Sequence, residues 1–376
     1  MHQLFWSCTV ALLLSPAAAF YPYTNRFPIH RVAVQRDNKY NVVSAAKPSQ
    51  PDSAGVNEDG TDFTYFASMS FGEGKQSFNM LVDSGASNTW VMSSECTLDV
   101  CTAHNTFGTE DSSTLKVTGK AFGITYGTGS VEGVIGSDTA HFAGLSVPLT
   151  FGLGQNVSTE FMSYPMDGIV GLGRGDSTEP AIDAPTFMDA LKSSGAIKTK
   201  LYGLNLWRAS DGGTNNGEIT FGFPDSSKYS GSLSYVTTMT NSDGFWEIPI
   251  GEASVNGKSL GISQRSALID SGTSFILMPS DDAQKLHSQI QGSYQDGERY
   301  SIPCDWKGTV SITFNGVTYD ISYKDVVYTS TNDQCISNIV GRQTFGPTQW
   351  LVGDVFLKNV YSVFDFDGNR MGFGKK

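Results

Sequence analysis

The sequence has 376 residues, which is enough for two ordinary domains or one large one. Only 16% of the residues are charged, and the 41 glycines, 23 phenylalanines and 15 tyrosines favour strands and turns over helical repeats or coiled coils. The net charge is −12, so the protein repels phosphate and we expect no nucleic-acid partner.

The first 19 residues have the pattern of a signal peptide. An apolar core runs from Leu4 to Leu14, and Ala17 and Ala19 form an A-x-A cleavage site before Phe20. A membrane anchor is the alternative, but this run is short for a bilayer and no later segment reaches 18 apolar residues. We therefore predict export, to the extracellular space or to a vacuole, and no membrane association.

Residues 20–50 form a basic arm with a net charge of +4, whereas residues 51–376, called the body here, carry −16. Opposite charges predict that the arm docks on the body. The alternative is a solvated, disordered tail. The stretch 47–60 is rich in Pro, Ser, Asp and Gly, so it is expected to be an exposed linker, and 51–61 is assigned as the linker or mature N-terminal segment.

From Asp62 the sequence changes to short apolar runs bounded by glycine, which predict β-strands. The clearest runs cover residues 63–70, 77–82, 90–92 and 122–126. Helical signals are few, and the candidates are 186–193 and 280–291, the second opened by Ser280-Asp281-Asp282 as a cap.

The body contains an internal repeat. Leu81-Val82-Asp83-Ser84-Gly85-Ala86-Ser87 recurs as Leu268-Ile269-Asp270-Ser271-Gly272-Thr273-Ser274. An apolar pair and a glycine follow each copy, with Gly171 lying 88 residues after Asp83 and Gly353 lying 83 residues after Asp270. Two copies at so long a period indicate a duplicated domain.

Four cysteines remain after signal removal, and an even number in an exported chain predicts disulfides. Three connectivities are possible. Pairing Cys96 with Cys101 and Cys304 with Cys335 needs only local loops and is preferred. Zinc is the competing interpretation, but there is no C-x-x-C and no histidine at finger spacing, so we expect no metal.

An apolar strand that ends in Asp-Ser-Gly places a carboxylate at a buried strand end, and glycine permits the tight turn that follows. A single copy is common by chance. Two copies in a duplicated frame predict that Asp83 and Asp270 meet at the interface of the two halves. Two carboxylates in contact share one proton, so one can activate water while the other protonates an amide carbonyl. That pair is a standard example for aspartic proteases.

With these motifs the body resembles the pepsin family of aspartic endopeptidases over residues 62–376. The matching pieces are Asp83-Ser84-Gly85, Trp90, Ile124 to Ser130, Asp167 to Gly171, Asp270 to Ser274, and Leu351 to Phe356. The resemblance implies an all-β, bilobal fold with lobes at 62–225 and 226–376 that flank a cleft. It also implies a hairpin flap whose Tyr126 leans toward Trp90, and a monomer without cofactor that hydrolyses proteins at acidic pH.

The resemblance further implies how peptide substrates bind. The backbone of an extended peptide would pair with the flap and with both turns, and apolar pockets would take large side chains on both sides of the scissile bond. The residues implied are Gly85, Gly127, Thr128, Gly272, Thr273 and Ser274 for the backbone, and Ile169, Phe161 and Tyr126 for the pockets. Relatives that accept Lys carry Asp where this chain has Thr128, so cleavage after Lys is not expected. The arm resembles a propeptide that inhibits its own enzyme, with Lys39-Tyr40 as the blocking pair.

Two departures from the family pattern concern the catalytic turns. Serine follows each aspartate at Ser84 and Ser271, where threonine is usual, and the hydroxyls can still hydrogen-bond between the lobes. Ala86 stands where a serine commonly donates to the first catalytic carboxylate, while Thr273 is kept in the second copy. We expect this asymmetry between the two turns to affect the acid pH range in which the enzyme is active.

Export predicts one further feature, because Asn156-Val157-Ser158 is the only N-glycosylation sequon. An inactive pepsin-like binding or inhibitor protein is the main alternative to an enzyme. A carbohydrate-active enzyme with two carboxylates is a weaker one, because the duplicated Asp-Ser-Gly frame argues against it.

Overall fold

Short apolar runs bounded by glycine form strands here, as their composition predicts, and the chain is largely β. The computed structural model describes residues 40–48, 50–177, 180–329 and 335–376, and these belong to one compact unit. The expected signal peptide, Lys39 and most of the basic arm lie outside the described residues.

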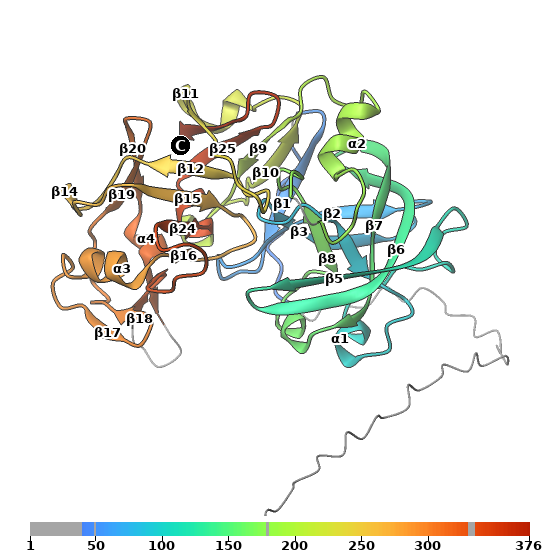
Figure 1. Cartoon of the computed structure of the whole chain (residues 1–376), viewed down its shortest axis with the longest axis horizontal. Helices are drawn as coiled ribbons and strands as arrows, with labels where there is room; N and C mark the ends of the chain where they lie inside the picture. The colour runs from blue at the N-terminus through green and yellow to red at the C-terminus, as the bar shows by residue number, and fades with distance from the viewer. Residues whose placement is uncertain (1–39, 49, 178–179, 330–334) are drawn as a thin grey trace, which may run out of the picture. The chain divides into compact units, whose positions relative to one another are not determined.

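Strands dominate the described chain, and helices are few and short (Figure 1). The strands are β1 (Ser53–Glu58), β2 (Tyr65–Phe71), β3 (Ser77–Asp83), β4 (Trp90–Met92), β5 (Lys116–Tyr126), β6 (Gly129–Phe142), β7 (Leu145–Val157), β8 (Gly168–Gly171), β9 (Leu201–Asn205), β10 (Glu218–Phe221), β11 (Ser230–Thr237), β12 (Glu247–Ile250), β13 (Glu252–Val255), β14 (Lys258–Ser259), β15 (Arg265–Ile269), β16 (Ile276–Leu277), β17 (Tyr294–Asp296), β18 (Arg299–Ser301), β19 (Val310–Phe314), β20 (Val317–Ile321), β21 (Val327–Thr329), β22 (Cys335–Ser337), β23 (Ile339–Val340), β24 (Gln349–Val352), β25 (Val360–Asp365) and β26 (Arg370–Lys375). The helices are α1 (Asp99–Thr102), α2 (Phe187–Ser193), α3 (Ser280–His287), α4 (Tyr323–Val326) and α5 (Asp354–Leu357), with 3-10 turns η1 (Thr159–Ser163), η2 (Ala209–Asp211) and η3 (Ser226–Lys228).

The sequence repeat is a repeat of topology, which confirms the predicted duplication and the bilobal pepsin-like fold. The strand order β2-β3-β8-β4-β7 in the first half matches β12-β15-β24-β16-β23 in the second. The directions match as well: antiparallel, parallel, antiparallel and parallel in both series. The register is shared, since Leu81 pairs with Ile169 and Leu268 pairs with Leu351.

The two halves are joined by continuous strand pairing. β25 from the end of the chain pairs with β9 of the first half, and β26 and β11 extend the same sheet to 13 strands. The predicted lobe boundary at 225/226 therefore falls between β10 and β11. Both of these strands belong to the sheet that the two halves share. The core is closed by large side chains, with Trp90, Trp246 and Trp350 fully buried.

The exposed-linker interpretation of 47–60 is wrong for residues 53–58. They form β1, which pairs with β10 through Ser53–Gly55 and with β2 through Val56–Glu58. Val56 and Glu58 are buried. The composition of this segment favours a turn, but backbone pairing with β10 and β2 holds it in an extended conformation.

The two expected helices exist, but the predicted Ser280-Asp281-Asp282 cap is wrong, because Pro279 is the N-cap of α3 and no side chain caps it. α2 begins after Thr186, whose hydroxyl accepts from the Asp189 amide in a capping box. α3 ends at His287 rather than at 291, because the following amides of Gln289 and Ile290 bond three residues back instead of four.

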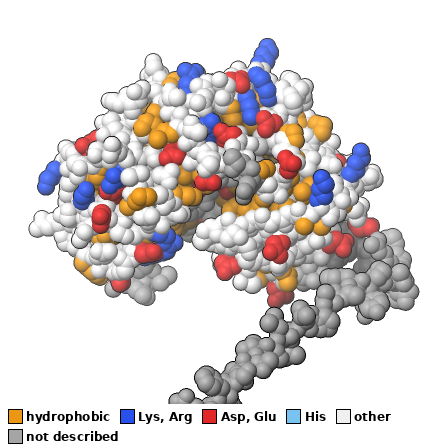
Figure 2. Space-filling model, in the orientation of Figure 1, with side chains coloured by type: hydrophobic (Ala, Val, Ile, Leu, Met, Phe, Trp, Pro, Cys, Tyr) orange, Lys and Arg blue, Asp and Glu red, His pale blue; other side chains and the backbone are white. Residues whose placement is uncertain are grey.

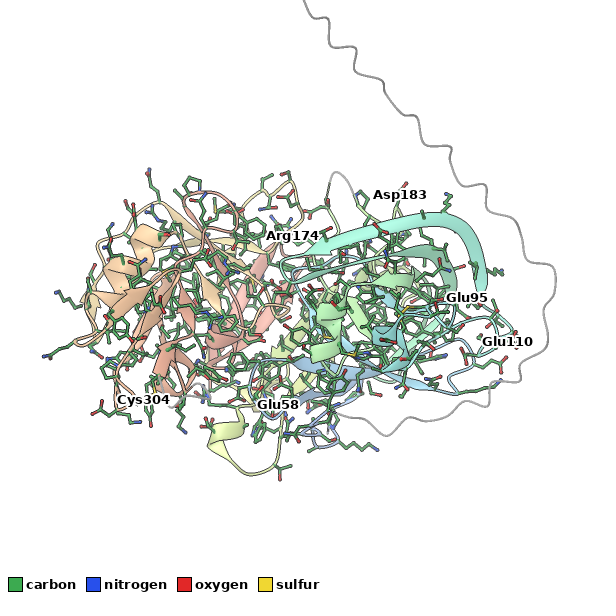
Figure 3. The ribbon with its side chains drawn as sticks, turned by 90° about the horizontal axis from the view of Figure 1, so that it is seen from below. Glu58, Glu95, Glu110, Arg174, Asp183 and Cys304 are labelled. Atoms are coloured by element: carbon green, nitrogen blue, oxygen red, sulfur yellow. A yellow bond between two sulfur atoms is a disulfide. The ribbon has the colours of Figure 1, made fainter. Side chains whose placement is uncertain are left out.

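The chain contains the Cys96–Cys101 and Cys304–Cys335 disulfides. They stabilise different halves: Figure 3 shows Cys304 and Glu95, the neighbour of Cys96, on opposite sides. Within the described ranges no helix is long and apolar enough to cross a membrane. In the same residues no group of three His, Cys, Asp or Glu is placed to hold a metal ion.

Candidate active site

Asp83 and Asp270 occupy equivalent strand ends. Asp83 is the last residue of β3 beside Gly171, and Asp270 follows β15, its amide donating to the Val352 carbonyl at 3.1 Å. After each aspartate the backbone turns, and the amide of the glycine two residues later donates to the carboxylate. Gly85 donates to Asp83 and Gly272 donates to Asp270, both at 2.8 Å. The repeated Asp-Ser-Gly sequence thus makes the same turn twice.

The two turns are held together by the serines that follow the aspartates. The Ser84 amide donates to the Ser271 hydroxyl at 3.0 Å, and the Ser271 amide donates to the Ser84 hydroxyl at 2.9 Å. Each hydroxyl then donates across the interface, Ser84 to the Ile269 carbonyl and Ser271 to the Val82 carbonyl. All four bonds are buried, so serine in place of threonine keeps this interlobe link.

Only glycine fits after each serine, because each glycine lies against the opposite carboxyl group. A Cβ on Gly85 would lie 2.5 Å from Oδ1 of Asp270, and one on Gly272 would lie 2.6 Å from Cγ of Asp83. These crossed approaches show that the carboxyl groups of the two halves meet at one place.

The two carboxyl groups are almost closed to solvent, with Asp83 at 5% and Asp270 at 9% exposure. Burial raises the pKa of Asp83 well above its usual value, and the neighbouring charge of Asp270 raises it further. The Gly85 and Ala86 amides oppose this shift by donating to the carboxylate. The arrangement therefore favours one proton and one negative charge on the pair.

The turns differ in one donor. Asp270 receives the Thr273 hydroxyl on Oδ2 at 2.6 Å in addition to the Gly272 amide on Oδ1. Asp83 receives the Gly85 and Ala86 amides, both on Oδ1, at 2.8 and 3.0 Å. Ala86 supplies a backbone donor but has no hydroxyl to match that of Thr273.

A long hairpin of β5 and β6 carries Tyr126 (Figure 1). Tyr126 pairs with Gly129, so Gly127 and Thr128 form a two-residue turn that is exposed. The Tyr126 hydroxyl accepts a hydrogen bond from Trp90 Nε1 at 2.8 Å. Burial and the charge of Asp83 raise the pKa of Tyr126, which remains a neutral phenol.

The predicted pocket residues lie in one apolar cluster with the flap tyrosine. Phe161 of η1 packs edge-on against Trp90, with ring centroids 5.4 Å apart, and against Tyr126 at 6.2 Å. Ile169 of β8 is buried and pairs with Trp90 across the sheet.

The remaining predicted residues lie in several places. Ser274 donates to the Phe63 carbonyl at 2.5 Å, so it links the second turn to the segment before β2. Asn156 is exposed on β7 and donates to Glu132. Tyr40 stacks on His104 and donates to the Met162 carbonyl, while its expected partner Lys39 lies outside the described residues.

Sequence reasoning gave no role to two buried polar residues near this site. Asp354, next to Gly353, is buried, and burial raises its pKa despite the charge of Lys358. His104 lies between α1 and η1, with carbonyl partners far apart in sequence. Figure 2 shows acidic side chains scattered over the surface, so surface charge alone would not have marked the site.

Comparisons with known proteins agree with this geometry. Residues 64–376 match the family model described as eukaryotic aspartyl protease. The chain is 46% identical over 345 residues to a probable aspartic-type endopeptidase CTSD of Trichophyton verrucosum, covering 91% of this chain and 67% of that protein. It is 41% identical to aspartic-type endopeptidase ctsD of Aspergillus fumigatus, covering 93% of this chain and 73% of that protein. It is 34% identical to pepsin A of Bos taurus, covering 83% and 84%.

Proposed function

We propose that this chain, which belongs to the eukaryotic aspartyl protease family and is an aspartic endopeptidase, cleaves peptide bonds with Asp83 and Asp270 as its catalytic pair. The observation that supports the pair is the crossed approach, in which each glycine lies against the carboxyl group of the other half. Two carboxyls that cannot both ionise act as one acid and one base. The ionised member takes a proton from water, and the protonated member donates to the scissile carbonyl.

Acidic pH follows from the same pair. The reaction needs one proton on the two carboxyls, and the raised pKa of Asp83 keeps that proton bound to higher pH than on an ordinary aspartate. At higher pH both carboxylates ionise and the acid is lost. We infer a bell-shaped rate profile on the acid side of neutrality.

Substrates are proposed to be extended peptides with large apolar residues on both sides of the scissile bond. The exposed turn Gly127-Thr128 offers backbone groups from the flap, and Gly85, Gly272, Thr273 and Ser274 offer others from below. Phe161, Ile169 and Tyr126 supply apolar surface. A charged residue at Thr128 would be needed to attract lysine, and none is present.

The chain is further proposed to be an exported monomeric zymogen. Its signal is residues 1–19 and its inhibitory arm is residues 20–50, with Lys39 and Tyr40 blocking the pair. Because β1 belongs to the central sheet, the active form should begin before Ser53. The lobes are assigned to 62–225 and 226–376, and Asn156, exposed on β7, is the glycan site.

Substitution of either aspartate tests the catalytic pair. Asp83→Asn and Asp270→Asn should each reduce peptide hydrolysis by at least 10²–10⁴-fold, the usual contribution of acid–base catalysis. Each variant should unfold like the wild type in urea. Retention of a tenth of the wild-type rate by either variant would disprove the assignment. An inactive binding protein, the alternative, would show no hydrolysis of casein by the wild type at pH 3–5.

A further inference from the structure

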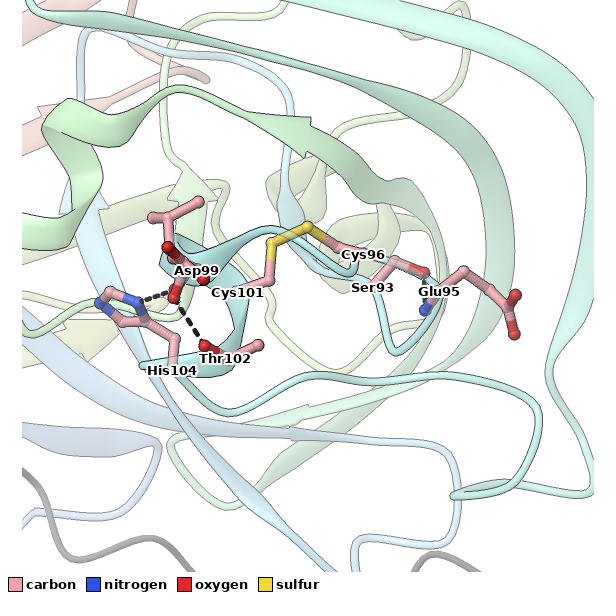
Figure 4. Close-up of a disulfide and its surroundings, with 8 residues drawn as sticks. Ser93, Glu95, Cys96, Asp99, Cys101, Thr102 and His104 are labelled. Carbon is pink, nitrogen blue, oxygen red and sulfur yellow. Dashed lines mark hydrogen bonds between the residues drawn. A yellow bond between two sulfur atoms is a disulfide. The ribbon is translucent and has the colours of Figure 1, made fainter. Parts of the chain in front are cut away.

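The three histidines in the described part of the chain have different hydrogen-bond partners. His104 lies just after α1, the short helix closed by the Cys96–Cys101 disulfide (Figure 4). Its Nδ1 is 2.7 Å from the Val100 carbonyl and its Nε2 is 2.8 Å from the Tyr164 carbonyl. The side chain is buried. Both ring nitrogens therefore face an atom that can only accept.

A neutral imidazole has one N–H, so it can satisfy only one of these two carbonyls. The imidazolium donates to both. His141 differs, because one nitrogen faces the Gly72 carbonyl and the other faces the Ser146 hydroxyl, which can donate to it. His287 has a single carbonyl partner, and its other nitrogen has none. Among the described histidines, His104 alone needs its charge to complete its hydrogen bonds.

One buried carboxyl group interacts electrostatically with His104. Asp167 is buried nearby, and the positive charge of His104 lowers its pKa against the effect of burial. The Tyr40 ring stacks on the imidazole at 5.4 Å. The other titratable groups on the elements packed against it are Asp99 of α1, Glu160 of η1 and Tyr164.

The Tyr164 carbonyl belongs to the segment that supports the flap. This segment contains η1 and its Phe161, whose ring packs against Tyr126. Ser158, just before η1, accepts from the Ser130 amide at 2.9 Å and donates its own amide to the Ser130 carbonyl at 3.0 Å. Gly129 has no room for a Cβ, because Ser158 and Phe161 lie within 3 Å of that position. The returning strand of the flap is thus fixed to η1, and η1 is fixed to α1 through His104.

We propose that His104 is a positioning residue: its imidazolium ties α1 to η1 and so holds Phe161 and the flap in the substrate-binding arrangement. When the ring loses its proton, one carbonyl is left unpaired, η1 loosens and substrate binds more weakly. Because the flap encloses substrate, the effect falls on KM rather than on kcat. This inference rests on the flap role of Tyr126 proposed above.

The test compares His104→Gln with wild type between pH 4 and 7.5. A glutamine amide cannot reach both carbonyls, so at pH 4 we expect KM, and Kd for a statine-type inhibitor, to rise about three- to tenfold, the effect of one hydrogen bond. kcat should change less than twofold. The ratio of variant to wild-type Kd should fall toward one by pH 7.5, because histidines lose their proton between about pH 5 and 8. Inhibitor binding is measured by calorimetry, so it needs no turnover.

His141→Gln is the matched control and should leave the Kd ratio at one throughout. A His104→Gln ratio that is the same at every pH, or no change at pH 4, would overturn the proposal. If the variant does not fold, wild type labelled on histidine and phenylalanine rings is titrated by NMR. The Phe161 signals should then shift with the same midpoint as His104, and a different midpoint would overturn the proposal. Tyr126→Ala tests the flap role separately from the His104 proposal. An unchanged KM in this variant would refute the flap role of Tyr126, and the link between His104 and Phe161 would then be decided by the NMR titration.

Discussion

Replacing His287 by phenylalanine should stabilise the protein in acid and have little effect near neutral pH. His287 is buried at the end of α3, its ring stacked on Tyr300 at 3.8 Å and parallel within 2°. Nδ1 faces the Ala283 carbonyl, and Nε2 has no partner. Burial lowers the pKa of His287 from 6.5 to about 4, because a charged ring here would lose its water.

The size and sign of the effect follow from this shift. The unfolded chain binds the proton near pH 6.5 and the folded chain binds it only near pH 4, so stability is lost as pH falls through that window. A shift of this size corresponds to about 3 kcal/mol, fully lost below pH 4. Phenylalanine has no proton to bind and keeps the stacking on Tyr300.

Urea unfolding measured by fluorescence from pH 3 to 7 tests this, with a tight inhibitor present in all samples to prevent self-digestion. The free energy of unfolding of His287→Phe minus that of wild type should grow by about 3 kcal/mol between pH 7 and pH 3.5. His141→Phe is the control and should show no such growth. A difference for His287→Phe that is the same at every pH would refute the reasoning.

Two further predictions concern carboxyl groups. Burial raises the pKa of Glu58 to about 7, and its Oε1 has no hydrogen-bond partner. The stability that the protonated Glu58 gives below pH 4.5 is therefore lost as pH rises through 7. Glu58→Gln should raise the midpoint of urea unfolding at pH 7.5 and not at pH 4, and an equal change at both would contradict this. Ala86→Ser should give Asp83 the hydroxyl donor that Thr273 gives Asp270, and so move the acid limb of kcat/KM down by about half a unit to one unit; a limb that stays in place would mean that Ala86 is only a small turn residue.

The two Asp-Ser-Gly turns could be predicted from sequence because their determinants are local. An apolar strand, an aspartate and a glycine fix the turn within five residues, and the repeat gives the partner. The hairpin flap was expected from the family resemblance, and the structure forms a hairpin there, with Tyr126 and Gly129 paired across a two-residue turn. The helix at 280–291 was too long in prediction, because its end depends on backbone bonds that periodicity does not encode.

What could not be predicted depends on distant partners. β1 has a turn-forming composition and becomes a strand only because β10, more than 150 residues later, lies beside it. His104 and the Tyr164 carbonyl are 60 residues apart, so no sequence window contains both. The pairing of β25 with β9 joins the two halves in one sheet. The sequence repeat predicts two lobes but not this shared sheet.

Two buried titratable groups favour folding over a limited range of acid pH. His287 opposes folding when it is charged, so it weakens the protein below about pH 4. Glu58 opposes folding when it is charged, so it weakens the protein toward pH 7. The proposed catalytic pair also needs a bound proton, so the fold and the proposed chemistry both favour acid pH.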